Sequence, residues 1–291
     1  MMETSAVVAP RAIIPYEDLR RRLPEMRHTY ARAEPYPHLV IDDFLDPQVL
    51  GAALAEFPDL QSQEWIHYAH VNERKFGTID RLSFGPVLGQ VVDTLNADPF
   101  VSWLSDLTGI KALMADGSLE GGGLHQSERG GFLNAHADFT VHPHHRDWQR
   151  RVNVLVYLNA GWLEAYGGHL ELWDRAMKGC VKKILPVFNR AVIFSTDRES
   201  FHGHPEPLQC PVGMTRKSIA LYYFTKETGK PFVRSTEYRA RPGDGVKRVW
   251  IRLDNLVLRA YDRTKRALGI DDRFASAVLK RLSGRRSKSS N

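Results

Sequence analysis

The chain has 291 residues, of which 43% are hydrophobic and 25% are charged, a balance that is ordinary for a soluble globular protein with a hydrophobic core. Its length suits one sizeable domain with extensions, or two small domains. No apolar run approaches the ~20 residues that a membrane-spanning helix needs, so we expect no transmembrane segment.

The net charge of +6 is unevenly distributed. Residues 231–291 contain 16 Lys and Arg against 6 Asp and Glu, a balance of +10, which leaves −4 for residues 1–230. We therefore divide the chain into an N-terminal segment (1–35), a central domain (36–230) and a basic, largely helical C-terminal extension (231–291).

The start of the chain lacks the cationic region and apolar run of a secretory signal. We therefore expect a cytoplasmic protein. Two cysteines, Cys180 and Cys210, make no disulfide framework, and we expect both to be reduced, buried thiols.

The first 110 residues are expected to supply supporting helices around one apolar strand at residues 38–45. Asp46-Pro47 combines an N-cap residue with proline at the first helical position, which marks a helix start. Helical spacing of apolar residues predicts helices over residues 16–33, interrupted at Pro24, and over residues 47–57, 87–95 and 100–107.

From about Leu119 to residue 226 the pattern changes to short β-rich runs separated by turn residues. Many short strands of this kind favour a double-sheet jelly roll or a barrel. Strands are predicted over residues 119–126, 131–138, 151–158, 169–173, 181–187, 191–195, 200–206 and 218–224. The expected fold is therefore mainly β with flanking helices.

The C-terminal extension carries a helical pattern over residues 246–268, with Asp271 as the cap of a last helix. A basic amphipathic helix can bind an acidic surface such as an anionic membrane or a nucleic acid. We favour instead a helix packed on the domain with a solvated basic face. Asp254 and Asp262 interrupt the charge, and no clear nucleic-acid motif accompanies the helix.

His136 and Asp138 stand at positions i and i+2 of a predicted strand, so both side chains project from the same face. One imidazole and one carboxylate supply two ligands of the 2-His-1-carboxylate triad that binds non-haem Fe(II). A His-x-Asp pair alone is a weak signal. The third ligand is sought on a distant strand, after the apolar run at residues 191–194, where His202 and His204 share a strand face.

Arg216 follows these histidines on the last predicted strand. Its planar fork suits bidentate binding of a carboxylate such as the distal group of 2-oxoglutarate. Ser218 lies on the same strand face and has a hydroxyl that can donate a further hydrogen bond.

The order His136-x-Asp138, His202, Arg216-x-Ser218 resembles that of the Fe(II)/2-oxoglutarate dioxygenases, in particular the prolyl 4-hydroxylase-like branch. The resemblance covers residues 36–226 and is densest over 130–225. It extends through the runs 151–159, 167–170 and 189–194.

This resemblance implies a double-stranded β-helix (jelly-roll) core with N-terminal supporting helices. It implies that His136, Asp138 and His202 bind the metal, with no catalytic side chain beyond the metal centre. It also implies that Arg216 binds the 2-oxoglutarate C5 carboxylate, assisted by Tyr157, with Ser218 as a lesser candidate.

The implied cofactors are Fe(2+), 2-oxoglutarate as cosubstrate and O2, with ascorbate as a further candidate reductant. The implied activity is hydroxylation with release of succinate and CO2. The carboxylate of Asp138 favours hydroxylation, because halogenating relatives have a small residue there. The substrate stays open between a prolyl or other amino-acid side chain of a peptide, a sugar and a small metabolite.

Two other functions compete with this interpretation. One is a cupin-like metal-binding protein or a metal-dependent sensor without 2-oxoglutarate turnover, against which Arg216 argues, since such a protein needs no clamp for a dicarboxylate. The other is a basic-tailed adaptor for nucleic acid or membrane.

Further polar residues near these motifs have weaker interpretations. The cluster of His142, His144 and His145 suggests either a second metal or, as we favour, a polar loop at the mouth of the pocket. His169 and Glu171 are expected to pair or to face solvent. The adjacent Arg150 and Arg151 are either substrate-binding or surface residues.

Overall fold

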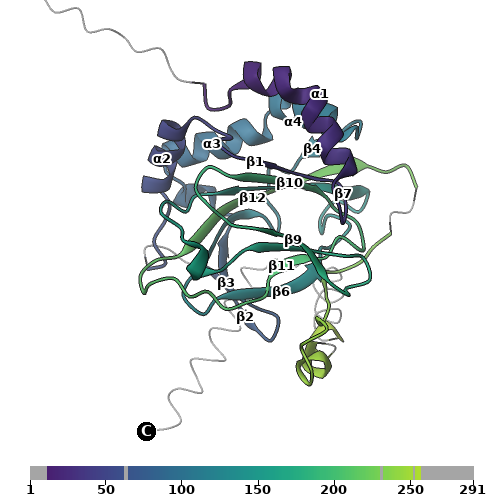
Figure 1. Ribbon diagram of the computed structural model, residues 1–291. Helices are drawn as coiled ribbons and strands as arrows, with labels where there is room; N and C mark the ends of the chain where they lie inside the picture. The colour runs from purple at the N-terminus through teal and green to yellow at the C-terminus, as the bar shows by residue number, and fades with distance from the viewer. Residues whose placement is uncertain (1–11, 62–64, 230–231, 252, 257–291) are drawn as a thin grey trace, which may run out of the picture.

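A computed structural model describes residues 12–61, 65–229, 232–251 and 253–256 (Figure 1). Four helices near the N-terminus, α1–α4, lie together on one side of the molecule, above the sheet formed by β1, β10, β7 and β12. The helices are α1 (Tyr16–Arg32), α2 (Pro47–Ala55), α3 (Pro86–Asn96) and α4 (Asp98–Thr108), with 3₁₀ turns η1 (Arg81–Ser83) and η2 (Glu164–Tyr166). None of the described helices has the length and hydropathy of a membrane span.

Local signals set most of the helix ends. The Asp46 carboxylate accepts hydrogen bonds from the backbone N–H groups of Gln48 and Val49, as the Asp-Pro pair predicts. Helix α4 ends at Gly109, whose φ of 73° is a left-handed conformation that favours glycine.

The expected interruption of the first helix at Pro24 is wrong, because α1 continues through this residue. Pro24 is exposed, so the carbonyl that loses its intrahelical partner lies on the solvent side and can bind water. Leu19, Met26 and Tyr30 are buried on the opposite side and hold the helix against the domain.

Among the described residues, thirteen strands form one continuous antiparallel sheet that curls into two facing layers. Their bounds are β1 (His38–Ile41), β2 (Ile66–His70), β3 (Glu73–Thr78), β4 (Met114–Ala115), β5 (Gly123–Ser127), β6 (Phe132–Ala137), β7 (Trp148–Tyr157), β8 (Leu170–Trp173), β9 (Cys180–Ile184), β10 (Ala191–Ser195), β11 (His202–His204), β12 (Arg216–Lys226) and β13 (Glu237–Tyr238).

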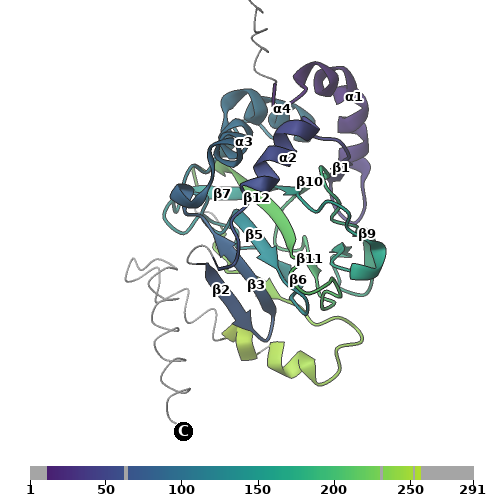
Figure 2. The same cartoon turned by 90° about the vertical axis from the view of Figure 1, so that its left-hand side faces the viewer.

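The order of the strands is β1-β10-β7-β12-β5-β3-β6-β11-β8-β9, with β13 on β6, β2 on β3 and β4 on β12. Strand β3 connects the layers, because it pairs with β5 through residues 76–78 and with β6 through residues 73–74 (Figure 2). This arrangement confirms the predicted jelly-roll core with N-terminal supporting helices.

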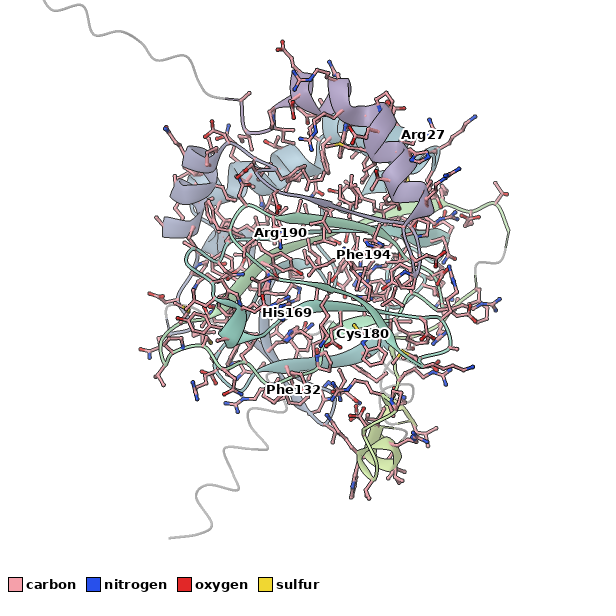
Figure 3. The ribbon with its side chains drawn as sticks, viewed as in Figure 1. Arg27, Phe132, His169, Cys180, Arg190 and Phe194 are labelled. Carbon is pink, nitrogen blue, oxygen red and sulfur yellow. The ribbon has the colours of Figure 1, made fainter. Side chains whose placement is uncertain are left out.

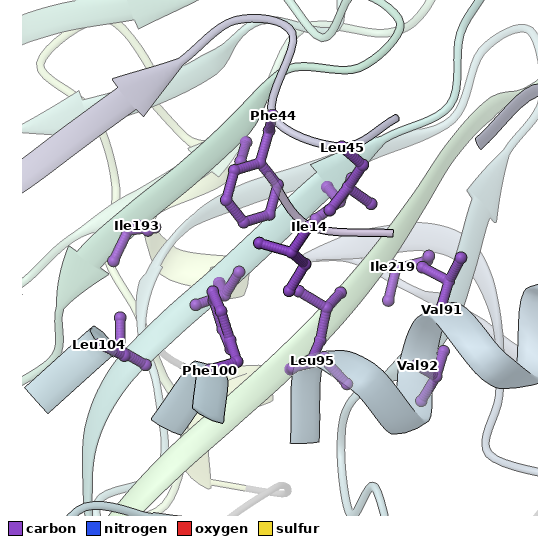
Figure 4. Packing of buried hydrophobic residues seen from close by; sticks show 14 of the residues in the cluster. Ile14, Phe44, Leu45, Val91, Val92, Leu95, Phe100, Leu104, Ile193 and Ile219 are labelled. Carbon is purple, nitrogen blue, oxygen red and sulfur yellow. The ribbon is translucent and has the colours of Figure 1, made fainter. Parts of the chain in front are cut away.

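The alternation of strand side chains separates the hydrophobic core from the interior of the jelly roll. On β7, Val152, Val154 and Val156 face the helices, whereas Asn153 and Tyr157 face inward. The helix-facing cluster is buried and includes residues from α3, α4, β10 and β12, as Figure 4 shows for Val91, Leu95, Phe100, Leu104, Ile193 and Ile219. Because this outer core carries the packing, the inner faces are available for polar side chains.

Phe194, labelled in Figure 3, packs between the layers with its ring centroid 4.7 Å from that of His202.

The two cysteines are free thiols, as expected, but only Cys210 is buried and Cys180 is half-buried. His169 and Glu171, which were expected to pair or to face solvent, have separate partners. His169 lies 2.8 Å from Glu164, and Glu171 is buried and accepts a hydrogen bond from the Trp173 indole.

Candidate metal centre

Two neighbouring strands of the inner layer bring three metal-binding side chains together. Strand β6 carries His136 and is followed at once by Asp138, and antiparallel pairing sets His202 of β11 directly opposite His136. The Nε2 atom of His136 lies 3.4 Å from Oδ1 of Asp138, and Nε2 of His202 lies 3.5 Å from Oδ2. The three ligand atoms lie within 4.8 Å of one another, which is close enough to share one ion.

Backbone carbonyls orient both imidazole rings. Nδ1 of His136 lies 2.9 Å from the Asn134 carbonyl, and Nδ1 of His202 lies 2.9 Å from the Ser200 carbonyl. Because a carbonyl only accepts, each Nδ1 carries the proton and donates it. The lone pair of each Nε2 is then directed to the shared point, as metal ligation requires. The donor set of two imidazoles and one carboxylate therefore fits Fe(II).

Asp138 is held by two side chains from β7. Oδ2 accepts a hydrogen bond from Asn153 at 2.8 Å and lies 3.0 Å from the Arg150 guanidinium. Burial alone raises the pKa of Asp138, but Arg150 and the two imidazoles outweigh burial and hold the pKa well below its usual range. The carboxylate is therefore ionised, with Oδ1 left for an ion.

Arg150 is a buried residue of the centre, with a relative exposure of 2%. Its guanidinium lies between the rings of Tyr222, at 3.3 Å, and Phe139, at 4.6 Å, and donates from Nε to Asn153. The interpretation of Arg150 as surface charge is wrong, because its charge is paired with Asp138. Arg151 points the other way, is half exposed and lies 3.7 Å from Glu227.

His204 is separated from the triad by a shift in strand register between it and His202. It is buried and lines the same cavity, and its Nδ1 has no hydrogen-bond partner among the described residues. Burial, with Arg216 and Lys75 acting in the same direction, holds its pKa well below the usual range. The structure thus brings His202, not His204, to Asp138.

Arg216, at the start of β12, points into the interior beside β7. Its Nε donates to the Gly168 carbonyl at 2.8 Å, and Nη2 lies 3.3 Å from the Tyr157 hydroxyl. Ser218 faces the same interior and stands opposite Tyr157 in the strand pairing. Burial raises the pKa of Tyr157, against the opposing effect of Arg216, so the phenol keeps its proton.

Gly168, the second glycine of the Gly167-Gly168 turn, lies against Arg216 at a position that requires glycine. Its φ is 72°, and a Cβ atom there would lie 2.5 Å from the Leu208 side chain and 3.0 Å from Arg216. Only glycine combines this conformation with the close approach that lets its carbonyl bind Arg216.

A cavity of about 620 Å³ contains the triad and extends to Arg216 and Ser218. One wall comes from the β2–β3 hairpin, which the sequence patterns did not predict. In this wall, His70 bridges Glu73 at 2.9 Å and Asp254 at 3.0 Å, and Lys75 lies 3.2 Å from Glu73. Burial lowers the pKa of His70, but the two carboxylates outweigh it and raise the pKa, so positive charge is favoured at this position.

The C-terminal extension supplies the rest of this wall. Strand β13 pairs with β6 so that Tyr238 stands opposite His136, with ring centroids 5.4 Å apart. Residues 231–291 were expected to form a basic, largely helical extension, and a two-residue strand gives no periodic signal by which to find it. Residues on both sides of the predicted boundary at residue 230 therefore line the cavity.

His125 of β5 also borders the cavity, and neither ring nitrogen makes a hydrogen bond of normal geometry to another described residue, although the Gly121 and Gly122 carbonyls are near. Burial, aided by Lys75, lowers the pKa of His125 to about 3, against ~6.5 for an unfolded chain. Between these two values the unfolded state binds more protons. The contribution of neutral His125 to the stability of the folded state is therefore complete above pH ~6.5 and is lost as the pH falls toward 3.

We predict that His125→Asn makes unfolding less sensitive to acid. The free energy of unfolding of the wild type should fall more steeply between pH 6.5 and 4, by up to about 1.4 kcal/mol per pH unit. Urea unfolding of both proteins across this range measures the difference. Identical slopes would show that His125 does not titrate differently in the folded state.

The cluster around His142 has a structural role. Nδ1 of His142 accepts hydrogen bonds from the backbone N–H groups of His144 and His145, and Nε2 of His142 lies 3.3 Å from Asp116. Over the part of the chain that the structure describes, the triad is the only group of three such side chains close enough to hold an ion. The second metal considered for this cluster has no support.

Comparisons with known proteins agree with this fold. Residues 122–224 match the family model of the 2OG-Fe(II) oxygenase superfamily. A prolyl-4-hydroxylase from Pseudomonas putida is similar in structure at 18% identity and a TM-score of 0.50, over 70% of this chain and 100% of that chain. A prolyl 4-hydroxylase structure from Phytophthora capsici is similar at 20% identity and a TM-score of 0.52, over 90% and 79% of the two chains. No curated protein sequence matches significantly.

Proposed function

We propose, from the premise that this chain is a 2OG-Fe(II) oxygenase, that His136, Asp138 and His202 hold its iron and that it hydroxylates a polar substrate in the cavity. The observation that carries the proposal is the convergence of the three side chains within 4.8 Å. Such a facial triad leaves coordination positions free for cosubstrate and oxygen. When bound, the iron supplies the oxidative chemistry that couples decarboxylation of 2-oxoglutarate to substrate oxidation.

The protein's own groups orient the reactants. We propose that Arg216 binds the C5 carboxylate of 2-oxoglutarate, with the Tyr157 hydroxyl beside it and Ser218 as a further donor. The support is that the guanidinium is already held by the Gly168 carbonyl and Tyr157, so it loses little freedom on binding. A cupin-like protein or a sensor without turnover has no use for this clamp.

The polar wall supports a polar substrate. His70, Glu73 and Lys75 face the cavity as a paired charge network, and the rings of Tyr68 and Tyr222 add apolar surface beside them. A prolyl or other amino-acid side chain, a sugar or a small polar metabolite is compatible with this mixture. The reaction consumes one 2-oxoglutarate and one O2 and forms succinate, CO2 and the hydroxylated product.

The proposal is tested by anaerobic titration of the purified protein with Fe(II) and 2-oxoglutarate. We expect a metal-to-ligand charge-transfer absorption band that needs both components. Candidate substrates are then screened for a change in this band and for succinate formation. Absence of the band at saturating Fe(II) and 2-oxoglutarate would contradict the proposed centre.

We predict that Arg150→Met weakens metal binding about 10- to 100-fold, the usual effect of removing a group that orients a metal ligand. The methionine keeps the apolar volume between Phe139 and Tyr222 but leaves Asp138 with Asn153 as its remaining donor on Oδ2. Isothermal titration with a divalent metal measures the affinity.

Arg151→Met is the matched control, because Arg151 is the next residue on β7 and points to the surface. It should leave the affinity unchanged. Equal affinities for the Arg150 and Arg151 variants would contradict the role given to Arg150.

A further inference from the structure

The C-terminal extension is helical over residues 247–251 and 253–256 and lies at the edge of the domain away from α1–α4 (Figure 1). The side of this helix that meets the domain is mostly polar. Lys247 donates to Asn134 at 3.1 Å, and Asn255 exchanges hydrogen bonds with the backbone of Tyr238 at 3.0 and 2.8 Å. Ile251, at 1% exposure, is the apolar anchor on this side.

The opposite side of the helix is apolar and exposed. Its members follow helical spacing and form one stripe. They are Val246 (78% exposed), in the turn just before the helix, and Val249 (55%), Trp250 (58%), Leu253 (48%) and Leu256 (60%) on the helix itself. Over the described part of the helix predicted for residues 246–268, this arrangement reverses the expectation that the apolar face would pack on the domain and leave a basic face in solvent; residues 257–268 and the helix predicted after Asp271 lie outside the described residues.

The reversal has a local cause. Asp254 on the domain side bonds His70 and Asn72, so the polar side of the helix is fixed by specific partners at the cavity wall. The apolar stripe is left outward as a consequence. A contiguous exposed apolar patch of this kind marks an interaction surface.

Charge selects among the possible occupants of this surface. The extension carries a balance of +10, of which +7 belongs to residues 257–291, the segment that follows the stripe directly in the sequence and lies outside the described residues, and Arg248 is exposed on the same helix. A second copy would oppose the same positive charge, and a nucleic acid offers no apolar layer to cover valine, leucine and tryptophan side chains. An anionic lipid surface offers both negative headgroups and an apolar layer.

We propose that the stripe formed by Val246, Val249, Trp250, Leu253 and Leu256 binds the protein peripherally to anionic lipid membranes. The helix lies in the plane of the interface with its apolar side chains inserted among the acyl chains, and the basic side chains contact the headgroups. This inference goes beyond the proposed enzymatic function and does not rest on it.

The test is co-sedimentation of the full chain with lipid vesicles. The protein should bind vesicles made of equal parts phosphatidylglycerol and phosphatidylcholine, and bind pure phosphatidylcholine vesicles more weakly. Binding to the anionic vesicles should weaken as salt rises from 0.1 to 1 M, because the screening length falls from ~10 to ~3 Å. Absence of binding to anionic vesicles at low salt would overturn the proposal.

The double variant Trp250→Ser and Leu253→Ser should reduce partitioning at least about tenfold, since two apolar side chains no longer insert. The matched control changes two other exposed apolar residues, Leu82→Ser (95% exposed) and Val212→Ser (91%), and should bind like the wild type. Circular dichroism checks that both variants are folded.

Equal binding by the wild type and the Trp250/Leu253 variant would overturn the proposal. So would a dimer in light scattering that this variant dissociates in the absence of lipid, since the stripe would then bind a second copy. Retained Fe(II) and 2-oxoglutarate binding in the variant separates a failure of this proposal from a failure of the proposed enzymatic function.

Discussion

Replacing His202 with alanine is expected to abolish Fe(II) binding and succinate formation, whereas replacing His204 with glutamine is expected to leave Fe(II) bound. Both histidines are buried on β11 and line the same cavity. Only His202 has its Nε2 atom beside Asp138, at 3.5 Å, and its Nδ1 atom occupied by a backbone carbonyl. The pair of variants therefore separates metal ligation from the presence of a buried imidazole.

Metal content after reconstitution and anaerobic Fe(II) titration measure the first effect, and succinate release measures the second. His136→Ala and Asp138→Ala should behave like His202→Ala, because a facial triad that loses one ligand binds Fe(II) poorly. The iron assignment would be wrong if His204→Gln lost the metal while His202→Ala retained it. Thermal unfolding of each apo-protein checks that the loss is not due to misfolding.

Replacing Arg216 with methionine is expected to raise the KM for 2-oxoglutarate on the order of 100-fold. A hydrogen bond between charged groups contributes about 1.5–3 kcal/mol, and a buried carboxylate that loses its fork is left unpaired. Arg216→Lys keeps the charge but loses the fork and the contact with Gly168, so we expect an intermediate KM.

Lys217→Met is the matched control for Arg216. It is the next residue on β12, and its Nζ bonds Thr215 rather than a group in the cavity. Steady-state kinetics with varied 2-oxoglutarate and fixed Fe(II) measures the effect. An unchanged KM in Arg216→Met, with Fe(II) still bound, would contradict the proposal that Arg216 binds 2-oxoglutarate. It would favour a metal-binding function without this cosubstrate.

Local sequence patterns were sufficient for the elements whose stability is local. The Asp46-Pro47 cap, the end of α4 at Gly109 and the apolar alternation of β7 are each visible in a few neighbouring residues. Pro24 shows the limit of such rules. The free-energy cost of a proline inside a helix depends on whether the carbonyl that loses its hydrogen bond can bind water. Which side of α1 packs on the domain decides this.

Strands β2, β3 and β13 were not predicted from sequence, for a physical reason. Their stability comes from pairing with partners far away in the chain, since β3 joins β5 to β6 and β13 adds to β6. Several of their cavity-lining side chains, among them His70, Glu73 and Lys75, are polar, so these strands lack the apolar alternation that marks a strand. The wall of the candidate site was therefore the part that sequence reasoning missed.

The sequence by itself determined the chemistry that this protein has available: a His-x-Asp pair, a distant histidine, an arginine on the last strand and enough short apolar strands for a jelly roll. These follow from residue type and spacing along one strand. Only the tertiary structure decided which histidine meets Asp138, that Arg150 pairs with that carboxylate, and that the C-terminal extension closes the cavity while turning its apolar side outward. Those outcomes depend on strand register and on contacts between residues distant in sequence, which local patterns do not encode.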